Sequence, residues 1–421
     1  MNQYFALGVA TFLLSHSAIG QTQSARVAPD APVFEKANAA AKGVYLPKVS
    51  IYPINDTGQT SSQCYQAVGN GLASCTSALS TAVNSNQDGM IGRDVTHSDS
   101  SDGRRGFSFT KLSVDGAVLQ SSAPSWACTR DNVTGLVWEN KTDDGGIHDK
   151  DNRYKVNGWT GDIAPFVSGT NAENLCGRSD WRLPTWFELN GLLDYGISSA
   201  PAIDTNWFVI APPPLGAPLS SYWTATQSND VAGSSAYRYC VNFTHAVSLA
   251  TCAISGKIYA RLVSGAGLAS AGRFRISSDG TEVTDRVLGL TWRRCLEGAS
   301  WSGVTCTGTP TGFMHHPALI HAQTQNGWRV PNIKEVMSIV DRGVNSPAWD
   351  TVLFPGTPQL NTSGAADYWL RRPTTSTVMP FDNNYIAMIS IGRDLRDNSW
   401  LGRGVHYLRL VKDISQSQVR K

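Results

Sequence analysis

The stretch Asp131-Asn-Val-Thr-Gly-Leu-Val-Trp138 returns later in the chain as Asp285-Arg-Val-Leu-Gly-Leu-Thr-Trp292. A second stretch, Asp180-Trp-Arg-Leu-Pro-Thr185, returns as Gly327-Trp-Arg-Val-Pro-Asn332. Both repeats keep a Gly-Leu-x-Trp piece and a Trp-Arg-x-Pro piece in the same order. A repeated order of this kind is the mark of an internal duplication.

Four further matches follow in the same order: Asp194–Gly196 with Asp341–Gly343, Pro201–Thr205 with Pro347–Thr351, Tyr222–Trp223 with Tyr368–Trp369, and Ala260–Val263 with Leu408–Val411. The spacing is nearly constant, since Pro184 and Trp223 are 39 positions apart and Pro331 and Trp369 are 38 apart. Chance does not produce six ordered matches. We therefore expect two homologous domains, copy 1 at 123–265 and copy 2 at 273–412.

Each copy is expected to be an α+β domain with few helices, short antiparallel strands and long loops. The Gly-Leu-x-Trp piece alternates apolar and polar residues, which predicts a strand. Pro184 and Thr185 are typical of a helix start, and Leu189, Leu192 and Leu193 then give a helical stripe. The Tyr-Trp and Arg-Leu-Val pieces predict short strands separated by Gly, Ser and Asn turns.

The residues before copy 1 differ in composition. Residues 1–20 hold a short apolar run and the small residues Ala18 and Gly20, which predicts a signal peptide cleaved before Gln21. Residues 21–45 are rich in Ala, Pro and Ser and predict a flexible arm. Residues 46–122 are expected to form a small β-rich lead-in. The chain is therefore expected to be exported, and to be secreted, at the cell surface or in the periplasm.

The composition excludes several classes of protein. Charged residues make up 16% of the 421 residues and the net charge is +2, which argues against a nucleic-acid-binding protein. No apolar run after the leader reaches the length of a membrane span, so we expect no transmembrane segment in the mature chain. The sequence also lacks GxSxG, HExxH and a suggestive Cys/His spacing, so we do not expect an enzyme.

Eight cysteines lie in the mature chain, and an even number in an exported protein favours disulfides. Three pairs are close in sequence, and Cys128 and Cys176 are left for each other. The expected disulfides are Cys64–Cys75, Cys128–Cys176, Cys240–Cys252 and Cys295–Cys306. Cys240 and Cys252 are placed as in a cross-strand bond of a hairpin. No CxxC or HxxxH spacing supports a zinc site.

The combined motifs resemble the Lcl C-terminal domain family, named after a Legionella collagen-like adhesin. The resemblance covers both copies, and copy 2 departs from it at Val330 and Asn332. The resemblance implies a C-type-lectin-like fold, a secreted or surface location, and adhesion through sulfated glycosaminoglycans in the name-giving adhesin. Partners would then be glycans, a host or matrix surface, or other envelope and surface proteins.

The repeated motif residues are interpreted as structural. A Trp at a strand-to-helix junction builds a core, and an Arg beside it can bond nearby carbonyls. Arg261 and Arg409 lie in apolar terminal strands and are expected to pair with carboxylates, with Asp194 and Asp341 as the candidates. The full set of structural residues is Trp138, Trp181, Arg182, Pro184, Trp223, Arg261, Trp292, Trp328, Arg329, Pro331, Trp369 and Arg409.

The candidate ligand site is a Gly-rich loop of copy 2. Residues 266–421 hold 17 Lys and Arg against 12 Asp and Glu, a net charge of +5. Arginine forks bind sulfate or carboxylate and an indole can stack on a sugar. The loop places three arginines around one tryptophan, namely Arg393, Arg396, Trp400 and Arg403. Asp394 and Asp397 partly neutralise it, and a solvated loop is the alternative.

The candidate metal site is an acidic loop of copy 1. Hard oxygen ligands on a tight loop suit Ca²⁺, and no other cofactor is expected. The alternative is a solvated hairpin tip balanced by neighbouring lysines. The loop carries Asp143, Asp144, Asp149 and Asp151. A weaker pattern, Asn84-x-Asn86-x-Asp88-Gly89, matches the opening of an EF-hand loop, but Val95 replaces its last ligand.

These observations give two hypotheses. In the first, the protein acts in adhesion or carbohydrate binding, with an anionic polysaccharide as the ligand. In the second, it is a non-catalytic structural or assembly component of a surface appendage or envelope complex.

Overall fold

We analysed a computed structural model of the chain. It describes residues 54–66, 72–97, 99–156, 163–197, 201–211, 221–227, 237–243, 250–268, 272–340, 350–357, 367–373, 385–390, 397–401 and 406–414. In 367–373, 385–390 and 397–401 the backbone alone is described. The predicted signal peptide at 1–20 and arm at 21–45 lie outside these residues.

The lead-in contains two short helices, a 3-10 turn and a two-stranded ribbon: β1 (Cys64–Tyr65), β2 (Leu72–Ala73), α1 (Ala78–Val83), η1 (Asp88–Met90) and α2 (Arg93–Thr96). Within the predicted bounds 46–122 there is also the strand β3 (Phe109–Leu112), which pairs with copy 1. The polar, Ser-rich stretch of the lead-in favours helix caps, as when Ser77 accepts the backbone N–H of Ser80 and begins α1.

Copy 1 begins earlier than the repeat itself indicates, because the strand before it joins its sheet. Its elements are β3 (Phe109–Leu112), β4 (Cys128–Asp131), β5 (Val137–Glu139), α3 (Ile163–Ala172), η2 (Leu175–Gly177), α4 (Trp186–Gly191), β6 (Ser221–Gln227), β7 (Tyr237–Asn242), β8 (Ala250–Ala253) and β9 (Val263–Ser264). The antiparallel sheets have the orders β3-β4-β5-β9 and β6-β7-β8.

Copy 2 repeats this plan. Its elements are β10 (Phe274–Ile276), β11 (Glu282–Asp285), β12 (Leu290–Arg293), β13 (Ser300–Trp301), β14 (Cys306–Thr307), β15 (Gly312–Phe313), α5 (His315–Gln323), α6 (Ile333–Ser338), β16 (Asp367–Pro373), β17 (Tyr385–Ser390), β18 (Asp397–Leu401), β19 (His406–Tyr407) and β20 (Val411–Asp413). The sheet β10-β11-β12-β20 matches β3-β4-β5-β9 strand for strand. The second sheet has the order β15-β19-β16-β17-β18.

The predicted helix starts are confirmed in both copies. Thr185 accepts the backbone N–H of Glu188, and the Glu188 carboxylate accepts the N–H of Thr185, so the two form a capping box at α4. Asn332 and Glu335 form the same box at α6. Asparagine therefore replaces threonine at the cap without loss of the motif, since both carry the oxygen that the cap needs.

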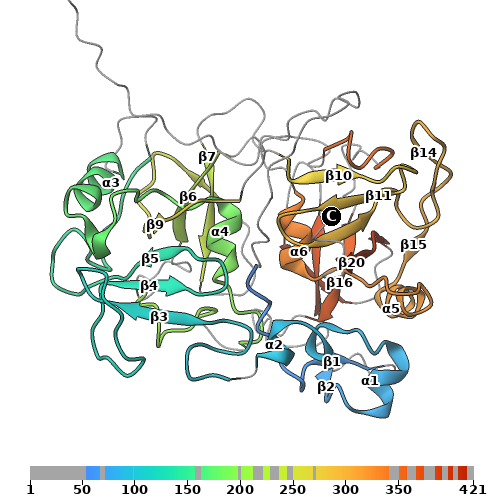
Figure 1. Cartoon of the computed structure of the whole chain (residues 1–421), viewed down its shortest axis with the longest axis horizontal. Helices are drawn as coiled ribbons and strands as arrows, with labels where there is room; N and C mark the ends of the chain where they lie inside the picture. Colours follow the sequence, from blue (N-terminus) through green and yellow to red (C-terminus); the bar gives the residue numbers. More distant parts are fainter. Residues whose placement is uncertain are drawn as a thin grey trace, which may run out of the picture.

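The two copies share one hydrophobic core. They lie side by side with α4 and α6 facing each other between them, and the lead-in runs beneath copy 2 (Figure 1). One continuous cluster of buried residues includes Trp138 and Leu189 of copy 1 with Trp292 and Val336 of copy 2. Each copy has a second, smaller cluster, and that of copy 2 also takes in Val83 of the lead-in. The two copies therefore pack against each other through a shared core and are not separate domains on a linker.

Four disulfides connect the elements, and they join the same pairs that the sequence indicates. Cys240–Cys252 links the neighbouring strands β7 and β8, and Cys295–Cys306 closes the loop after β12. Cys64–Cys75 lies in the lead-in, and Cys128–Cys176 ties β4 to η2 across 48 residues. The prediction of an α+β, disulfide-bonded fold with few helices and short antiparallel strands is confirmed.

Candidate functional site

The Trp-Arg-x-Pro junctions are built for structure. Arg182 donates to both carboxylate oxygens of Glu188 at 2.8 and 2.7 Å, and Glu188 also caps α4. Arg329 binds Glu335 in the same bidentate way at 2.7 Å to each oxygen. Each arginine therefore holds in place the glutamate whose carboxylate caps the start of the helix.

Most motif tryptophans lie in the core. Trp138, Trp223 and Trp292 are at most 1% exposed, and the Trp181 indole donates to the Leu175 carbonyl. Trp328 is half-buried between the cations of Arg293 and Lys412. The side chain of Trp369 lies outside the described residues.

The predicted partner of Arg261 was wrong. Arg261 is fully buried and donates to the backbone carbonyls of Glu139 and Val209. Asp194 is instead paired with Arg104 at 2.6 Å. A buried backbone carbonyl that is not bonded within a sheet needs another hydrogen-bond donor, and the Arg261 guanidinium supplies one. A carboxylate partner would instead have added a second buried charge.

Arg409 holds the same position in copy 2. It donates to the carbonyls of Arg293 and Arg294 and to the Thr357 hydroxyl. Its predicted partner, Asp341, lies outside the described residues.

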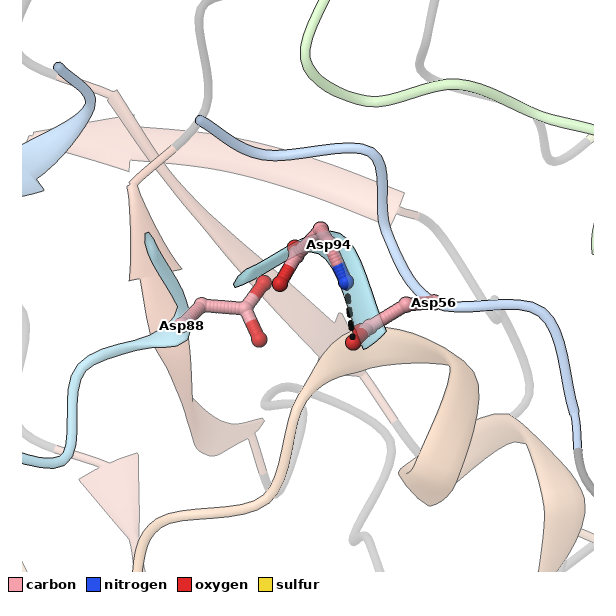
Figure 2. Close-up of side chains that lie close together, drawn as sticks. All are labelled: Asp56, Asp88 and Asp94. Carbon is pink, nitrogen blue, oxygen red and sulfur yellow. Dashed lines mark hydrogen bonds between the residues drawn. The ribbon is translucent and has the colours of Figure 1, made fainter. Parts of the chain in front are cut away.

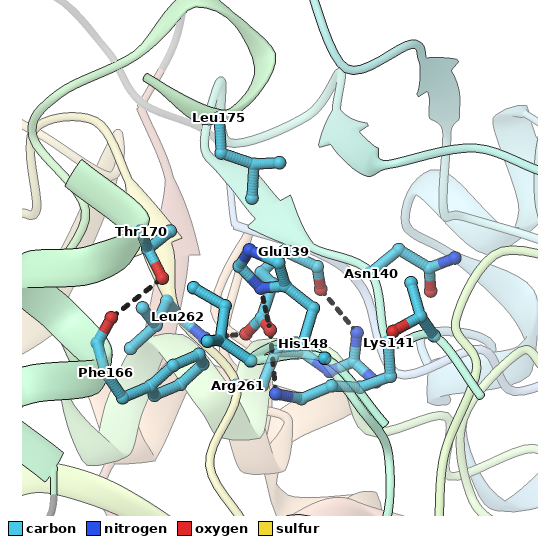
Figure 3. A network of polar contacts seen from close by, with 12 residues as sticks. Glu139, Asn140, Lys141, His148, Phe166, Thr170, Leu175, Arg261 and Leu262 are labelled. Carbon is cyan, nitrogen blue, oxygen red and sulfur yellow. Dashed lines mark hydrogen bonds and ion pairs between the residues drawn. The ribbon is translucent and has the colours of Figure 1, made fainter. Parts of the chain in front are cut away.

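A network of buried charges in copy 1 was not foreseen. One oxygen of Glu139 lies 2.7 Å from the Lys141 ammonium and 2.8 Å from His148 Nδ1, and the other accepts the N–H of Leu262 (Figure 3). His148 Nε2 lies 2.9 Å from Glu173. The only hint in the sequence was the pair of charged residues that directly follows a strand expected to be buried.

The network sets the protonation of its members. Burial opposes ionisation of Glu139, but the charges of Lys141 and His148 outweigh it and lower its pKa. Burial also disfavours charge on His148, yet its bonds to Glu139 and Glu173 raise the pKa of the imidazole. Carboxylate, ammonium and imidazole are acid–base groups, but here each contacts another member of the network. Its effect is to hold β5, the loop after it and α3 together.

The acidic loop brings together three of its four predicted ligands. Oxygens of Asp143, Asp149 and Asp151 lie within 4.8 Å of one another, and Asp144 is not part of the group. Asp149 also accepts the backbone N–H groups of Asp144 and Gly145. The Lys150 ammonium lies 2.5 Å from Asp143. The loop thus has internal partners for its carboxylates, and Ca²⁺ binding there stays a prediction.

A second acidic group lies where the lead-in meets copy 2. Carboxylate oxygens of Asp56, Asp88 and Asp94 lie within 4.8 Å of one another, and all three residues are buried (Figure 2). The Thr57 hydroxyl donates to Asp88, and Asn332 of copy 2 donates to Asp56. Sequence reasoning noticed Asp88 alone, in the EF-hand-like opening, because nothing in the sequence relates Asp56 to α6.

An apolar pocket lies at the junction of the copies. It is lined by Leu136, Trp138 and Phe187 of copy 1, Met337 of copy 2 and Ile54 of the lead-in. Asp131 also lines the pocket, and burial raises the pKa of its carboxyl.

The candidate ligand loop of copy 2 lies largely outside the described residues. Arg393, Arg396 and Arg403 fall outside them, and Trp400 is described as backbone of β18 only. The site that sequence reasoning placed there stays a prediction.

A scan against protein-family models gives one family, the Lcl C-terminal domain, at residues 127–264 and 281–412. The chain belongs to this family. The two matches confirm the tandem arrangement, and each begins after the first strand of the sheet whose order the copies share. No curated protein and no solved structure matches the chain significantly. Within the described residues, no helix of this Lcl-type protein is long and apolar enough to cross a membrane.

Proposed function

We propose that this protein is an exported, non-catalytic adhesin that binds an anionic polysaccharide through surface loops of its two Lcl-type domains. Membership of a family named after a surface adhesin, in both copies, carries the proposal. The four disulfides support it, because such bonds form and persist in oxidising, extracytoplasmic environments.

The internal contacts of the motif residues support a binding role rather than catalysis. Arg182 and Arg329 are bound to Glu188 and Glu335, and Glu139 is enclosed by its partners and fully buried. A catalytic group must reach a substrate in a cleft. We propose that the shared residues build the scaffold and that recognition belongs to the loops.

A C-type-lectin-like arrangement is part of the same proposal. Short strands joined by long connections, and a terminal strand that returns to the first sheet, support it in both copies. Such folds present loops from a rigid frame, which suits binding of a glycan.

A second candidate is a structural or assembly role through protein contacts. Val114 and Val118, on the loop after β3, are 68% and 65% exposed. Exposed apolar side chains close together favour a protein partner more than a glycan.

The test is binding of the mature chain, Gln21–Lys421, to immobilised heparin and to a panel of neutral glycans, at low and physiological salt. An adhesin for anionic glycans should be retained on heparin at physiological salt and lose retention as ionic strength rises. A protein that no glycan retains would have the structural role instead.

A further inference from the structure

A polar groove on copy 1 has a size and composition suited to a ligand. Its volume is about 450 Å³, within the range of small-molecule sites. Its walls include Leu112 at the end of β3, Gly116 on the loop after it, Arg130 on β4, Gly177 at the end of η2, and Arg178 and Asp180 on the segment that follows. The groove thus lies between the first sheet and the segment that follows η2.

The groove is held open by the fold. Thr110 is opposite Arg130 and Leu112 is opposite Cys128 in the β3–β4 register, so these four side chains share one face of the sheet. The Cys128–Cys176 disulfide anchors η2 over that face. Because the segment after η2 is covalently tied there, Arg178 is brought to the same groove as Arg130.

Two guanidinium groups line the groove without a direct ion pair to a described carboxylate. Arg130 donates from Nε to Asn132 at 3.0 Å and from Nη2 to Thr110 at 3.4 Å. Arg178 donates from Nη1 to Ser264 at 3.2 Å. Among the described residues neither forms an ion pair, and their other N–H groups make no hydrogen bond within the protein. Neutral partners therefore orient both forks and leave further N–H groups of each arginine to donate.

The acidic residue in the groove, Asp180, is linked to Arg178 through the Ser264 hydroxyl, and the nearby guanidinium charge helps to lower the pKa of its carboxyl. Asp180 accepts the Ser264 hydroxyl with one carboxylate oxygen and the Gly265 backbone N–H, at 3.0 Å, with the other. Both bonds direct the carboxylate toward β9. The donors that remain for a ligand belong to the two arginines.

Copy 2 lacks this groove chemistry. The repeat aligns Asp131 with Asp285 and Trp181 with Trp328, which places Thr284 at the position of Arg130 and Gln325 at that of Arg178. Gln325 accepts from Arg293. Both cations are therefore particular to copy 1, although copy 2 carries the larger net positive charge.

We propose that the Arg130–Arg178 groove binds the carboxylate or sulfate group of an acidic sugar unit in a polysaccharide. The proposal rests on the proposed function and locates its site. Two guanidinium forks on one anionic group give charge-assisted, bidentate hydrogen bonds, and the neutral polar walls can accept from sugar hydroxyls. The anionic-glycan site would then lie on copy 1, not on the arginine loop of copy 2.

The first experiment compares three proteins on hyaluronan, which carries carboxylates only, on keratan sulfate, which carries sulfates only, and on neutral dextran. The proteins are the mature chain, the Arg130→Gln/Arg178→Gln variant, and an Arg105→Gln/Arg275→Gln control that removes two charges outside the groove. The groove variant should bind at least tenfold more weakly and the control within twofold of the unaltered chain. The loss of binding on hyaluronan would identify the bound group as a carboxylate, and the loss on keratan sulfate would identify it as a sulfate.

Equal binding by the groove variant and the unaltered chain would overturn the groove and leave the proposed function in place. An Arg178→Lys variant, which keeps the charge but not the fork, should recover only part of the affinity. If it recovers all of it, two bidentate forks are not what binds the group. Circular dichroism melting of each variant checks that the fold is intact.

A second experiment reads the groove directly by NMR of the arginine Nε–H groups. Glucuronate or glucose 6-sulfate should shift the Arg130 and Arg178 signals, and glucose should not. If these sugars shift them while no polymer binds, the groove is correct and the adhesin proposal fails. If inorganic sulfate shifts them as strongly as the acidic sugars, the site takes any oxyanion and the assignment to a sugar is wrong.

Discussion

Asp131 of copy 1 and Asp285 of copy 2 are the last residues of the equivalent strands β4 and β11, and the same turn follows each. In both, one carboxylate oxygen accepts two backbone N–H groups of the following turn. The other oxygen differs, because Asp131 accepts the side-chain amide of Asn55 at 2.6 Å, whereas Asp285 binds the guanidinium of Arg273 at 2.6 Å.

The difference shows how the duplicated domains diverged. The turn is made by the backbone and was kept, while the second partner of the carboxylate was supplied from a new place. Copy 1 takes an uncharged amide from the lead-in, and copy 2 takes a cation from the residue that directly precedes its own first strand. Arg273 also donates to the Ser338 carbonyl at the end of α6. Copy 2 is thus self-sufficient at this point and copy 1 depends on the residues before it.

The largest expected loss of stability comes from removing the two partners of these carboxylates, Arg273 and Asn55. Arg273→Met leaves the Asp285 carboxylate buried without its cation, which costs about 3–5 kcal/mol. Asn55→Ala removes one neutral donor from Asp131 and should cost about 1–3 kcal/mol. The free energies of unfolding from denaturant titration give both values. Similar losses in the two variants would show that the charge on Arg273 is not what separates the copies.

One disulfide of copy 1, Cys128–Cys176, closes a much longer stretch of chain than the disulfide of copy 2. Cys128–Cys176 spans 48 residues and Cys295–Cys306 spans 11. Chain entropy predicts losses of about 4 and about 3 kcal/mol when each pair is changed to Ala. Thermal melting under oxidising conditions measures the difference. A larger loss in copy 2 would contradict the entropic account.

The helix caps sharpen the comparison on a smaller scale. Thr185→Ala removes one cap bond and should cost about 1 kcal/mol. Asn332→Ala removes the equivalent bond and also the contact of Asn332 with Asp56, so about 2 kcal/mol is expected. Thr185→Ser is the control, since it keeps the capping oxygen. Equal costs for the two alanine variants would mean that the contact with the lead-in adds nothing.

The smallest effect concerns pH and the network of copy 1. The pKa of His148 is raised in the folded protein, so the folded state holds this proton more tightly than the unfolded chain. The stabilisation is therefore complete below about pH 6.5 and disappears as pH rises through the raised pKa. The advantage of the unaltered chain over His148→Gln should be about 1 kcal/mol smaller at about pH 9 than at about pH 5.5.

Denaturant titrations at the two pH values measure this change, with His97→Gln as the control. His97 lies on the surface of the lead-in, and its described ring contact is the Thr96 hydroxyl rather than a carboxylate. An advantage over His148→Gln that stays constant with pH would show that the imidazole does not bridge Glu139 and Glu173 as a cation.

Local patterns in the sequence predicted much of the frame. Sequence patterns reflect interactions between residues that are close in the chain. Such interactions determine the helix starts at Thr185 and Asn332 and the strands around Trp138 and Trp292, and the duplication is visible in the order of the motifs. The partners of Arg261 could not be predicted, because a buried guanidinium is satisfied as well by carbonyls as by a carboxylate. The choice between them is made by residues far apart in sequence.

The candidate sites show the same limit. Asp143, Asp149 and Asp151 are close in sequence, and they were expected together and are together. By contrast, Asp56, Asp88 and Asp94 are far from Asn332 of copy 2 in sequence and lie beside it in the fold. In the groove, Arg178 lies near Arg130 because a disulfide ties η2 to β4. The net charge of the sequence favoured copy 2 as the ligand-binding copy. Net charge does not reveal which arginines are already paired with carboxylates and which can bind an anionic ligand.

The contact of the lead-in with α6 has a consequence for synthesis. Asp56 bonds to Asn332 and its carbonyl accepts the ammonium of Lys334, which also reaches the Gly191 carbonyl of copy 1. Asn332 follows Asp56 by 276 positions, which take roughly 14 to 55 s to translate at about 5–20 residues per second. For that time the start of the folded region waits for a partner that has not yet been made, so the contacts of Asp56 with α6 form only after copy 1 has been translated.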